Sequence, residues 1–358
     1  MNILVTFKTF GKQKDYLRKV FGSISNLYFK EDYSENEGYD LVSKADALLS
    51  WNPASEGIHK DRLLLEHVKF MQLLSAGYDH IQPEDFPEGL QIACNQGAYA
   101  EPMAEHTVAM MLALSKRLPL YHKQLASGQF NQLESQTKFI KGSTVGIIGF
   151  GAIGKATAKL LRPFGVRILA INSSGKTDEE IDFIGTLNDL DEVLKNSDSL
   201  VLSIALNRAT EGLFNQQKLE LMKEDAVLVN VARGDIIDER ALYEHLKTHP
   251  DFYAAIDAWW VEPFKYRKFE LHYPFFELPN LLGSPHNSAM VANSLLMGTE
   301  HAAQNLLRFV HGEKVQGLIR YDSFGWQIHT SREETDKEIT PVRVIQKIKK
   351  GGKYDNRK

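Results

Sequence analysis

Short apolar runs alternate with more polar stretches through the first third of the chain. Runs of strand length occur at residues 2–7, 45–51 and 70–74. Residues 59–68 have the apolar spacing of a helix, and residues 103–116, rich in Ala, Met and Leu, predict a longer helix that is apolar nearly all round. Such a helix should be buried in the protein or between subunits. Residues 119–139 are polar and irregular and predict an extended arm.

A second alternating series begins at Ser143. Its predicted strands are residues 144–149, 166–171, 199–204, 226–231, 254–257 and 281–283. Residues 153–164 follow the first of these strands with a helical pattern. Strands that are apolar on both faces and separated by helices predict a doubly wound parallel sheet. The whole pattern predicts an α/β protein with two Rossmann-like or flavodoxin-like domains, which a length of 358 residues also favours.

Composition narrows the class of protein. Apolar residues make up 43% and charged residues 25%, which is typical of a globular chain, and a formal net charge of −4 gives no sign of a nucleic-acid partner. No apolar run reaches the ~20 residues that span a bilayer, and the first residues, MNILVTF, do not resemble a signal peptide. Cys94 is the single cysteine and is expected to be buried and unreactive. We therefore expect a cytoplasmic protein that needs no membrane and no metal.

The glycine-rich run GFGAIG follows the strand predicted at residues 144–149 and opens a helix. Gly149 permits a tight turn, Gly151 lets the backbone approach a pyrophosphate, and Gly154 lets the helix pack closely on the strand. Ala152 and Ile153 complete the loop. The helix N-terminus then offers free N–H groups to the phosphates, so the run predicts a dinucleotide site.

The end of the strand at residues 166–171 should carry the group that reads the adenosine ribose. An NAD site favours a carboxylate there. This chain instead has the run Asn172, Ser173, Ser174, Gly175 and Lys176. Two hydroxyls and a lysine suit a 2′-phosphate better, so the sequence favours NADP over NAD, with a simple polar turn as the alternative.

Three charged residues follow later predicted strands. They are Arg233, Glu262 and His286. The carboxyl ends of the strands are where an open α/β sheet binds its ligands. A histidine can donate and accept a proton near neutral pH, a carboxylate beside it would orient the ring, and an arginine can hold the carboxylate and carbonyl oxygens of a 2-oxo acid. Together they predict hydride transfer between a nicotinamide dinucleotide and a small 2-oxo or 2-hydroxy acid.

The order GFGAIG, VNVARGDIIDERAL, DAWWVEP and SPH resembles the D-isomer-specific 2-hydroxyacid dehydrogenases over roughly residues 40 to 320. The resemblance implies Arg233, Glu262 and His286 as the catalytic residues and a contact from Asp257 to the nicotinamide carboxamide. It also implies that the backbone N–H groups of Ala76 and Gly77 bind the substrate carboxylate. We add Ala232 to the expected cofactor contacts.

The same resemblance implies a discontinuous substrate domain and a homodimer. The substrate domain would comprise residues 1–99 and 286–320, the inserted dinucleotide domain would comprise residues 100–285, and residues 321–358 would form an extension of unknown role. The helix at residues 103–116 and the arm at residues 119–139 would form the subunit interface. The chain departs from the family pattern after the strand at residues 199–204, where the usual Pro and Thr are absent, and at Ala289, which stands where a glycine is common.

Two other functions fit the same motifs. A formate- or phosphite-type dehydrogenase shares the fold, although a formate enzyme typically has Gln where Glu262 stands. A dinucleotide-sensing regulatory protein could retain the catalytic residues without turnover. For an enzyme, glyoxylate and hydroxypyruvate are the expected substrates, because no extra basic cluster for a phosphorylated acid lies near residues 75–79.

Overall fold

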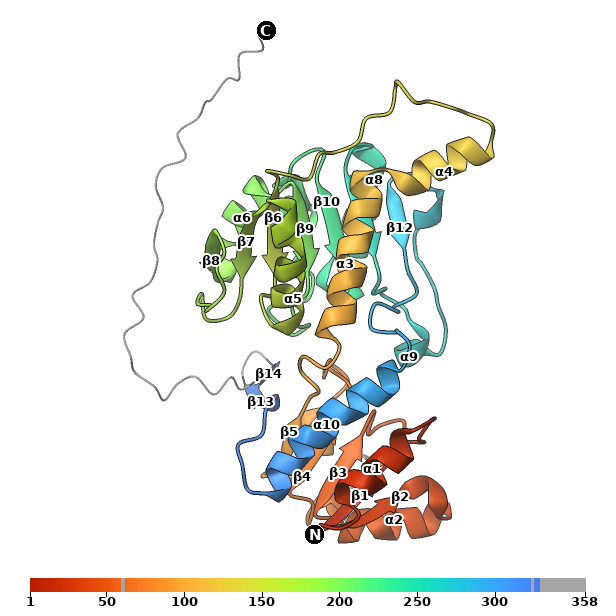
Figure 1. Ribbon diagram of the computed structural model, residues 1–358, viewed down its shortest axis with the longest axis vertical. Helices are drawn as coiled ribbons and strands as arrows, with labels where there is room; N and C mark the ends of the chain where they lie inside the picture. The colour runs from red at the N-terminus through yellow and green to blue at the C-terminus, as the bar shows by residue number, and fades with distance from the viewer. Residues whose placement is uncertain (59–61, 323–324, 329–358) are drawn as a thin grey trace.

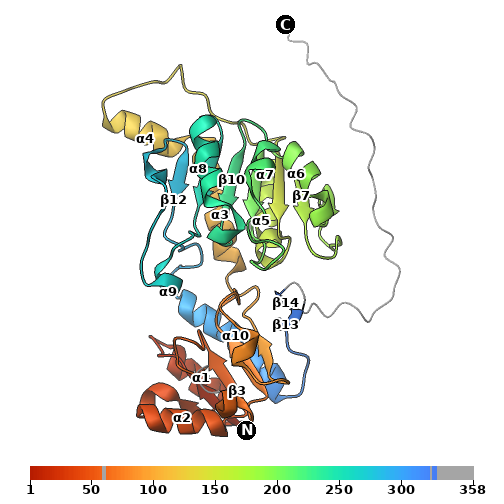
Figure 2. The same cartoon turned by 180° about the vertical axis from the view of Figure 1, so that it is seen from behind.

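Buried apolar strands build two separate seven-stranded sheets, each in its own lobe (Figure 1). The computed structural model describes residues 1–58, 62–322 and 325–328. In both views the lobe that contains the GFGAIG run lies above the lobe that contains the N-terminus. Helix α3 (Ala100–Ser115) leads the chain from one lobe to the other (Figures 1 and 2). The chain returns to the first lobe after β12 and continues into α10 (Ser294–Val310).

The sheet of the first lobe has the strand order β14-β13-β5-β4-β3-β1-β2. Its strands are β1 (Asn2–Val5), β2 (Asn26–Phe29), β3 (Ala47–Ser50), β4 (Phe70–Leu73), β5 (Gln91–Ala93), β13 (Leu318–Asp322) and β14 (Gly325–Ile328). The first five are parallel, whereas β13 pairs antiparallel with both β5 and β14. One face is covered by α1 (Gln13–Phe21) and α10, and the other by α2 (Glu35–Lys44) and the loops after β3 and β4.

The sheet of the second lobe is parallel throughout, with the order β12-β11-β10-β9-β6-β7-β8. Its strands are β6 (Thr144–Ile148), β7 (Arg167–Ile171), β8 (Phe183–Gly185), β9 (Ser199–Leu202), β10 (Val227–Asn230), β11 (Tyr253–Ile256) and β12 (Leu281–Gly283). Successive strands run outward from β6 on one side and from β9 on the other. This switch point between β6 and β9 is where a ligand of such a sheet binds.

Helices cover both faces of the second sheet, as the two-sided burial of its strands requires. Helices α3 and α5 (Ala152–Leu161) pack on one face, and α6 (Leu190–Asn196), α7 (Gln216–Glu220) and α8 (Glu239–Thr248) pack on the other. The α/β class with two doubly wound sheets is therefore confirmed. The first sheet also contains strands that the sequence pattern did not predict, namely β2, β5, β13 and β14, and β13 and β14 form an antiparallel edge.

Several local predictions need correction. The expected arm at residues 119–139 begins with a helix, α4 (Leu118–Ala126), because Pro119 occupies its first turn, where a proline needs no hydrogen-bond donor. The helix expected at residues 59–68 is a single 3-10 turn, Arg62–Leu65, and residues 59–61 lie outside the described part. The expected domain boundary after residue 320 falls inside β13, so the first lobe extends at least to Ile328. The remainder of the expected extension, residues 329–358, lies outside the described residues.

Two further observations concern the described residues as a whole. No helix among them is both long and apolar enough to cross a bilayer. They also contain no cluster of three or more His, Cys, Asp or Glu side chains arranged to hold a metal ion. Cys94 is buried at the end of β5, and burial raises the pKa of its thiol to about 12.

Candidate active site

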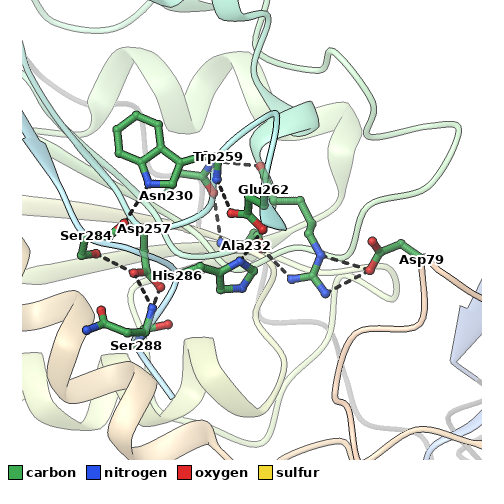
Figure 3. Close-up of polar contacts among 11 residues, drawn as sticks. Asp79, Asn230, Ala232, Asp257, Trp259, Glu262, Ser284, His286 and Ser288 are labelled. Atoms are coloured by element: carbon green, nitrogen blue, oxygen red, sulfur yellow. Dashed lines mark hydrogen bonds and ion pairs between the residues drawn. The ribbon is translucent and has the colours of Figure 1, made fainter. Parts of the chain in front are cut away.

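Glu262 and His286 lie close together beyond the carboxyl ends of β11 and β12 (Figure 3), and Arg233 follows the carboxyl end of β10. The three strands are neighbours in the sheet, so their following loops meet at one edge. The structure therefore brings together the three side chains that the sequence singled out. Arg233 faces the first lobe, because it contacts Asp79 of that lobe.

The imidazole of His286 is paired with the carboxylate of Glu262. The distance between His286 Nδ1 and Glu262 Oε2 is 2.7 Å, while Glu262 Oε1 accepts a hydrogen bond of 2.6 Å from the Trp259 amide. Both carboxylate oxygens are thus engaged, which fixes the ring that Glu262 holds. A proton on Nδ1 that is committed to Glu262 leaves Nε2 as the atom that can exchange a proton with a ligand.

The loop that carries His286 is fastened to Asp257. His286 has a positive φ of 49°, which is unfavourable for a residue with a side chain, and its N–H donates to the Asp257 carbonyl at 2.9 Å. The Asp257 carboxylate accepts hydrogen bonds from the Ser284 hydroxyl at 2.5 Å, the Asn287 amide at 3.0 Å and the Ser288 amide at 3.1 Å. Burial opposes ionisation, but these hydrogen bonds outweigh it and hold the pKa of Asp257 below its usual value.

This arrangement bears on the role expected for Asp257. Its side chain has no exposed surface, and its oxygens already accept three hydrogen bonds. Asp257 therefore positions the His286 loop in this structure. A contact between Asp257 and a nicotinamide carboxamide stays a prediction.

Arg233 is held by an ion pair that crosses between the lobes. Its Nε and Nη2 lie 3.0 and 2.9 Å from the same oxygen, Asp79 Oδ1, and its Nη1 donates to the Ala232 carbonyl at 2.8 Å. Asp79 is partly buried; desolvation alone would raise its pKa, but the charge and hydrogen bonds of Arg233 lower it overall. Sequence reasoning did not select Asp79, although it is the only acid in the loop quoted for the substrate carboxylate.

The backbone of the loop after β4 lies directly against Arg233. A Cβ built on Gly77 would fall 1.7 Å from Arg233 Nη2, so a side chain there would displace the guanidinium from its place against the loop. Within the described part of the chain, the N–H groups of Ala76 and Gly77 have no hydrogen-bond acceptor. Two free amides beside a guanidinium form an arrangement that can bind a carboxylate.

The three glycines of the GFGAIG run have three different surroundings. A Cβ on Gly149, whose φ is +100°, would lie 2.4 Å from the Ile204 amide nitrogen, so the loop after β9 requires glycine there. A Cβ on Gly154 would lie 2.6 Å from the Gly149 carbonyl oxygen, which reflects close packing of α5 on β6. A Cβ on Gly151, in contrast, would meet no protein atom within 4 Å. Nothing in the protein explains Gly151, whereas a bound pyrophosphate would, so the loop fits a dinucleotide. Ala152 and Ile153 form the first turn of α5 at this loop.

Some of the residues expected to read the ribose are exposed on the turn after β7. Another, Asn172, is hydrogen-bonded within the turn. The Asn172 side-chain carbonyl accepts hydrogen bonds from the Ser174 and Gly175 amides at 3.1 and 2.7 Å, and its amide donates to the Lys176 carbonyl at 2.8 Å. Asn172 therefore shapes the turn, which its position alone did not reveal. Ser173, Ser174 and Lys176 are exposed.

Asn230 and the two adjacent tryptophans, Trp259 and Trp260, have structural roles at the site. Asn230 clamps the loop that carries Arg233, since its side chain accepts from the Ala232 amide at 3.0 Å and donates to the Arg233 carbonyl at 2.9 Å. Trp259 and Trp260 are buried, and the Trp259 indole N–H donates to the Ser284 carbonyl at 2.8 Å. The tryptophans thus pack the loops together. Ala232 is also nearly buried, which leaves little of it to touch a cofactor.

Comparisons with known proteins agree with this architecture. Residues 108–288 match the family model "D-isomer specific 2-hydroxyacid dehydrogenase, NAD binding domain". The chain is 31% identical over 291 residues to a glyoxylate reductase of Pyrococcus furiosus, covering 78% of this chain and 84% of that protein. It is 30% identical over 231 residues to a hydroxypyruvate reductase of Thermotoga maritima, covering 64% and 73%. A D-lactate dehydrogenase of Aquifex aeolicus, solved with NAD and lactic acid, has the same fold, with a TM-score of 0.68, 24% identity and coverage of 87% and 96%.

Proposed function

Because the chain belongs to the D-isomer-specific 2-hydroxyacid dehydrogenase family, and is thus a nicotinamide-dinucleotide-dependent oxidoreductase, we propose that it reduces glyoxylate- and hydroxypyruvate-type 2-oxo acids. The observation that carries the proposal is the placement of the His286–Glu262 pair and Arg233 at one edge of the sheet, with the glycine loop at the switch point of that sheet. The named activities of the relatives support the same substrate class.

The proposed chemistry divides between the cofactor and the chain. The bound reduced nicotinamide supplies the hydride. Arg233 and the free amides of Ala76 and Gly77 bind the substrate carboxylate, and Arg233 also stabilises negative charge on the carbonyl oxygen as it develops. His286 donates the proton from Nε2 to that oxygen, and Glu262 stabilises the imidazolium through Nδ1. In the oxidative direction His286 takes the proton back.

A small substrate is supported by the charges around the loop after β4. The acid in this loop, Asp79, already neutralises Arg233, and the loop itself, residues 75–79, contains no lysine or arginine. A phosphorylated substrate would need further positive charge at this point. Glyoxylate and hydroxypyruvate need only one cation and two amides.

NADP is the proposed cofactor, with NAD as the alternative. The exposed hydroxyls of Ser173 and Ser174 and the exposed Lys176 follow β7, where an NAD site would favour an acid. The nearby Asp178 carboxylate is paired with Lys155 Nζ at 2.6 Å, which reduces its repulsion of a phosphate. Lys176 has no ion-pair partner among the residues described.

A homodimer through the second lobe is also part of the proposal. Large apolar side chains are exposed on and after α4, namely Leu118, Leu125, Phe130, Leu133 and Phe139. An extended segment that exposes this much apolar surface is typical of a subunit interface. Light scattering coupled to size exclusion should give the mass of two chains, and a single-chain mass would contradict the dimer.

The function is tested by assaying a panel of 2-oxo acids with NADH and NADPH while following the absorbance of the reduced cofactor. The panel should contain glyoxylate, hydroxypyruvate, pyruvate and a phosphorylated acid, with formate plus oxidised cofactor as a separate arm. We expect the highest kcat/KM for glyoxylate or hydroxypyruvate with NADPH. Tight cofactor binding without turnover of any acid would contradict the enzyme proposal and favour a dinucleotide sensor.

A further inference from the structure

A hollow of about 490 Å³ lies between α1 and α10 in the first lobe, on elements distinct from the loops that carry Arg233, Glu262 and His286. Its polar lining residues are Tyr16, Glu300, His301, Gln304, Arg308 and Gln316. Four of them belong to α10, at spacings that place them on one side of the helix. The volume is within the range of small-molecule sites. No part of the proposed reaction uses this hollow.

The hollow carries two opposite charges that are not paired with each other. Neither the Glu300 carboxylate nor the Arg308 guanidinium has an ion-pair partner among the residues described. The two residues are eight positions apart on α10, which is roughly 12 Å along the helix axis. Gln304 lies midway between them. This separation is longer than that between side chains on neighbouring turns, which can form a direct ion pair. A ligand with both charges can, however, lie between the two side chains.

His301 lies between these charges and connects the hollow to the protein interior. Its Nδ1 is 2.8 Å from Asn95 Oδ1, and Asn95 is buried. The Asn95 amide nitrogen already donates to the Leu74 and Gly298 carbonyls at 3.1 and 2.8 Å, so Oδ1 must accept and Nδ1 of His301 must donate. His301 Nε2, which has no partner within the described residues, is left as an acceptor. Burial, and then the charge of Arg308, lower the pKa of His301, which keeps the ring neutral.

Asn95 in turn holds the loop that is proposed to bind substrate. Its backbone N–H donates to the Ser75 carbonyl at 2.8 Å. Because the peptide group is planar, fixing the Ser75 carbonyl also fixes the direction of the Ala76 N–H. A continuous chain of hydrogen bonds therefore runs from His301 through Asn95 to one of the two free amides of the loop.

We propose that this hollow binds a small zwitterionic α-amino acid, with the ligand carboxylate on Arg308 and the ammonium group on Glu300 and His301 Nε2. The site matches both charges of such a ligand and offers an acceptor for an ammonium proton. A ligand with only a carboxylate would leave Glu300 unpaired and would repel it. A ligand with only an amine would leave Arg308 unpaired and would repel it.

Binding at this site is coupled to the substrate loop. A proton donated to His301 Nε2 makes Nδ1–H a stronger donor to Asn95, since linked hydrogen bonds polarise one another. A more firmly held Asn95 orders the Ala76 amide, which lowers KM for the 2-oxo acid and leaves kcat nearly unchanged. We expect a decrease in KM of about fivefold or more, the lower end of common coupling between sites.

Binding is tested separately from catalysis by titration calorimetry on the Arg233→Ala variant saturated with NADPH, because this variant lacks the cation of the proposed catalytic site. Glycine, alanine and leucine are the amino-acid probes, and glycolate, acetate and methylamine carry one charge only. We expect one amino-acid site per chain and at least tenfold weaker binding of the single-charge probes. Added Arg308→Gln or Glu300→Gln should weaken amino-acid binding tenfold or more, while Lys19→Gln, on the exposed side of α1, should not.

Three results would overturn the proposal: no binding of any amino acid, equal binding of glycolate and glycine, or unchanged binding in the Arg308→Gln variant. The kinetic part rests on the proposed function and is measured with the wild-type chain, where glycine should lower KM for the 2-oxo acid and should have no effect in Arg308→Gln. An unchanged KM in the wild type would overturn the coupling. Absence of all turnover would instead count against the proposed function, and calorimetry would still decide the site.

Discussion

Arg233 and Asp79 stand 154 positions apart in the chain, and their side chains meet across the two lobes with two contacts to one carboxylate oxygen, of 3.0 and 2.9 Å. The pair fixes the guanidinium beside the free amides of Ala76 and Gly77. In the proposed mechanism, the geometry of substrate binding therefore depends on Asp79, which takes no part in proton transfer.

Asp79→Asn should impair substrate use without removing the fold. Loss of the charge frees the Arg233 guanidinium to adopt other positions, and misplacement of a binding group on this scale costs roughly tenfold to hundredfold in kcat/KM. We expect most of the effect in KM for the 2-oxo acid. Steady-state kinetics with the control Glu88→Gln, an exposed acid in the following segment, would test it. Equal kinetics for Asp79→Asn and the wild type would show that the ion pair does not position Arg233.

His286→Ala should abolish most turnover while the affinity for the cofactor stays nearly the same. General acid–base catalysis of this kind contributes roughly 10²–10⁴-fold to the rate. The matched control is His272→Ala, because His272 forms a similar 2.6 Å pair with Glu239 on the surface. Single-turnover rates and cofactor fluorescence titrations separate the two effects. A parallel loss of cofactor binding would assign His286 a structural role.

Gly151→Ala and Gly154→Ala should separate cofactor binding from packing. A Cβ at position 151 meets no protein atom within 4 Å, so stability should be unchanged while cofactor affinity falls about tenfold or more, or roughly 1.4 kcal/mol. A Cβ at position 154 meets the Gly149 carbonyl, and such overpacking costs about 1–3 kcal/mol of stability. Urea unfolding and cofactor titration measure both quantities. Unaltered cofactor affinity in Gly151→Ala would argue against a pyrophosphate at this loop.

Lys176→Ala should weaken NADPH and leave NADH nearly unaffected. The ammonium group is exposed beside the turn after β7, and loss of one charged contact to a phosphate costs about tenfold in affinity or more. Lys159→Ala removes an exposed charge from α5 and serves as the control. Dissociation constants for both cofactors, measured with both variants, decide the matter. Equal changes for NADH and NADPH would contradict the proposed preference for NADP.

The pH dependence of stability should reflect His245 of α8. Burial, with a smaller contribution from the charge of His249, lowers the pKa of His245 from 6.5 to about 4. Between these values the unfolded chain binds the proton and the folded chain does not, so stability is complete above pH 6.5 and decreases as the pH falls toward 4. The total decrease is about 3 kcal/mol at 1.36 kcal/mol per pH unit.

The measurement is the free energy of unfolding in urea at pH 7 and pH 4.5 for the wild type and His245→Leu. The variant should lose less stability between the two pH values than the wild type does. His67→Gln, which alters an exposed histidine, should leave the dependence unchanged. The same pH dependence in His245→Leu and the wild type would show that His245 is not the group that titrates.

Features that depend on local pattern could be predicted from the amino-acid sequence. Two-sided apolar runs separated by helices indicated the doubly wound sheets, and GFGAIG after such a run indicated the glycine loop at the switch point. Arg233, Glu262 and His286 could be singled out because each follows a strand, and carboxyl ends of neighbouring parallel strands share one edge. In each case the signal lies within a few residues of the feature.

Roles that depend on contact between distant segments could be seen only in the folded protein. Asp79 is an ordinary loop acid until the two lobes place it on Arg233, and Gly77 is a simple turn residue until the guanidinium occupies the space of its Cβ. Asn172 shapes its turn and Asp257 holds the His286 loop through hydrogen bonds that the spacing of residues in the sequence does not predict. The physical reason is that such roles follow from distances and burial, which are set by packing of the whole chain.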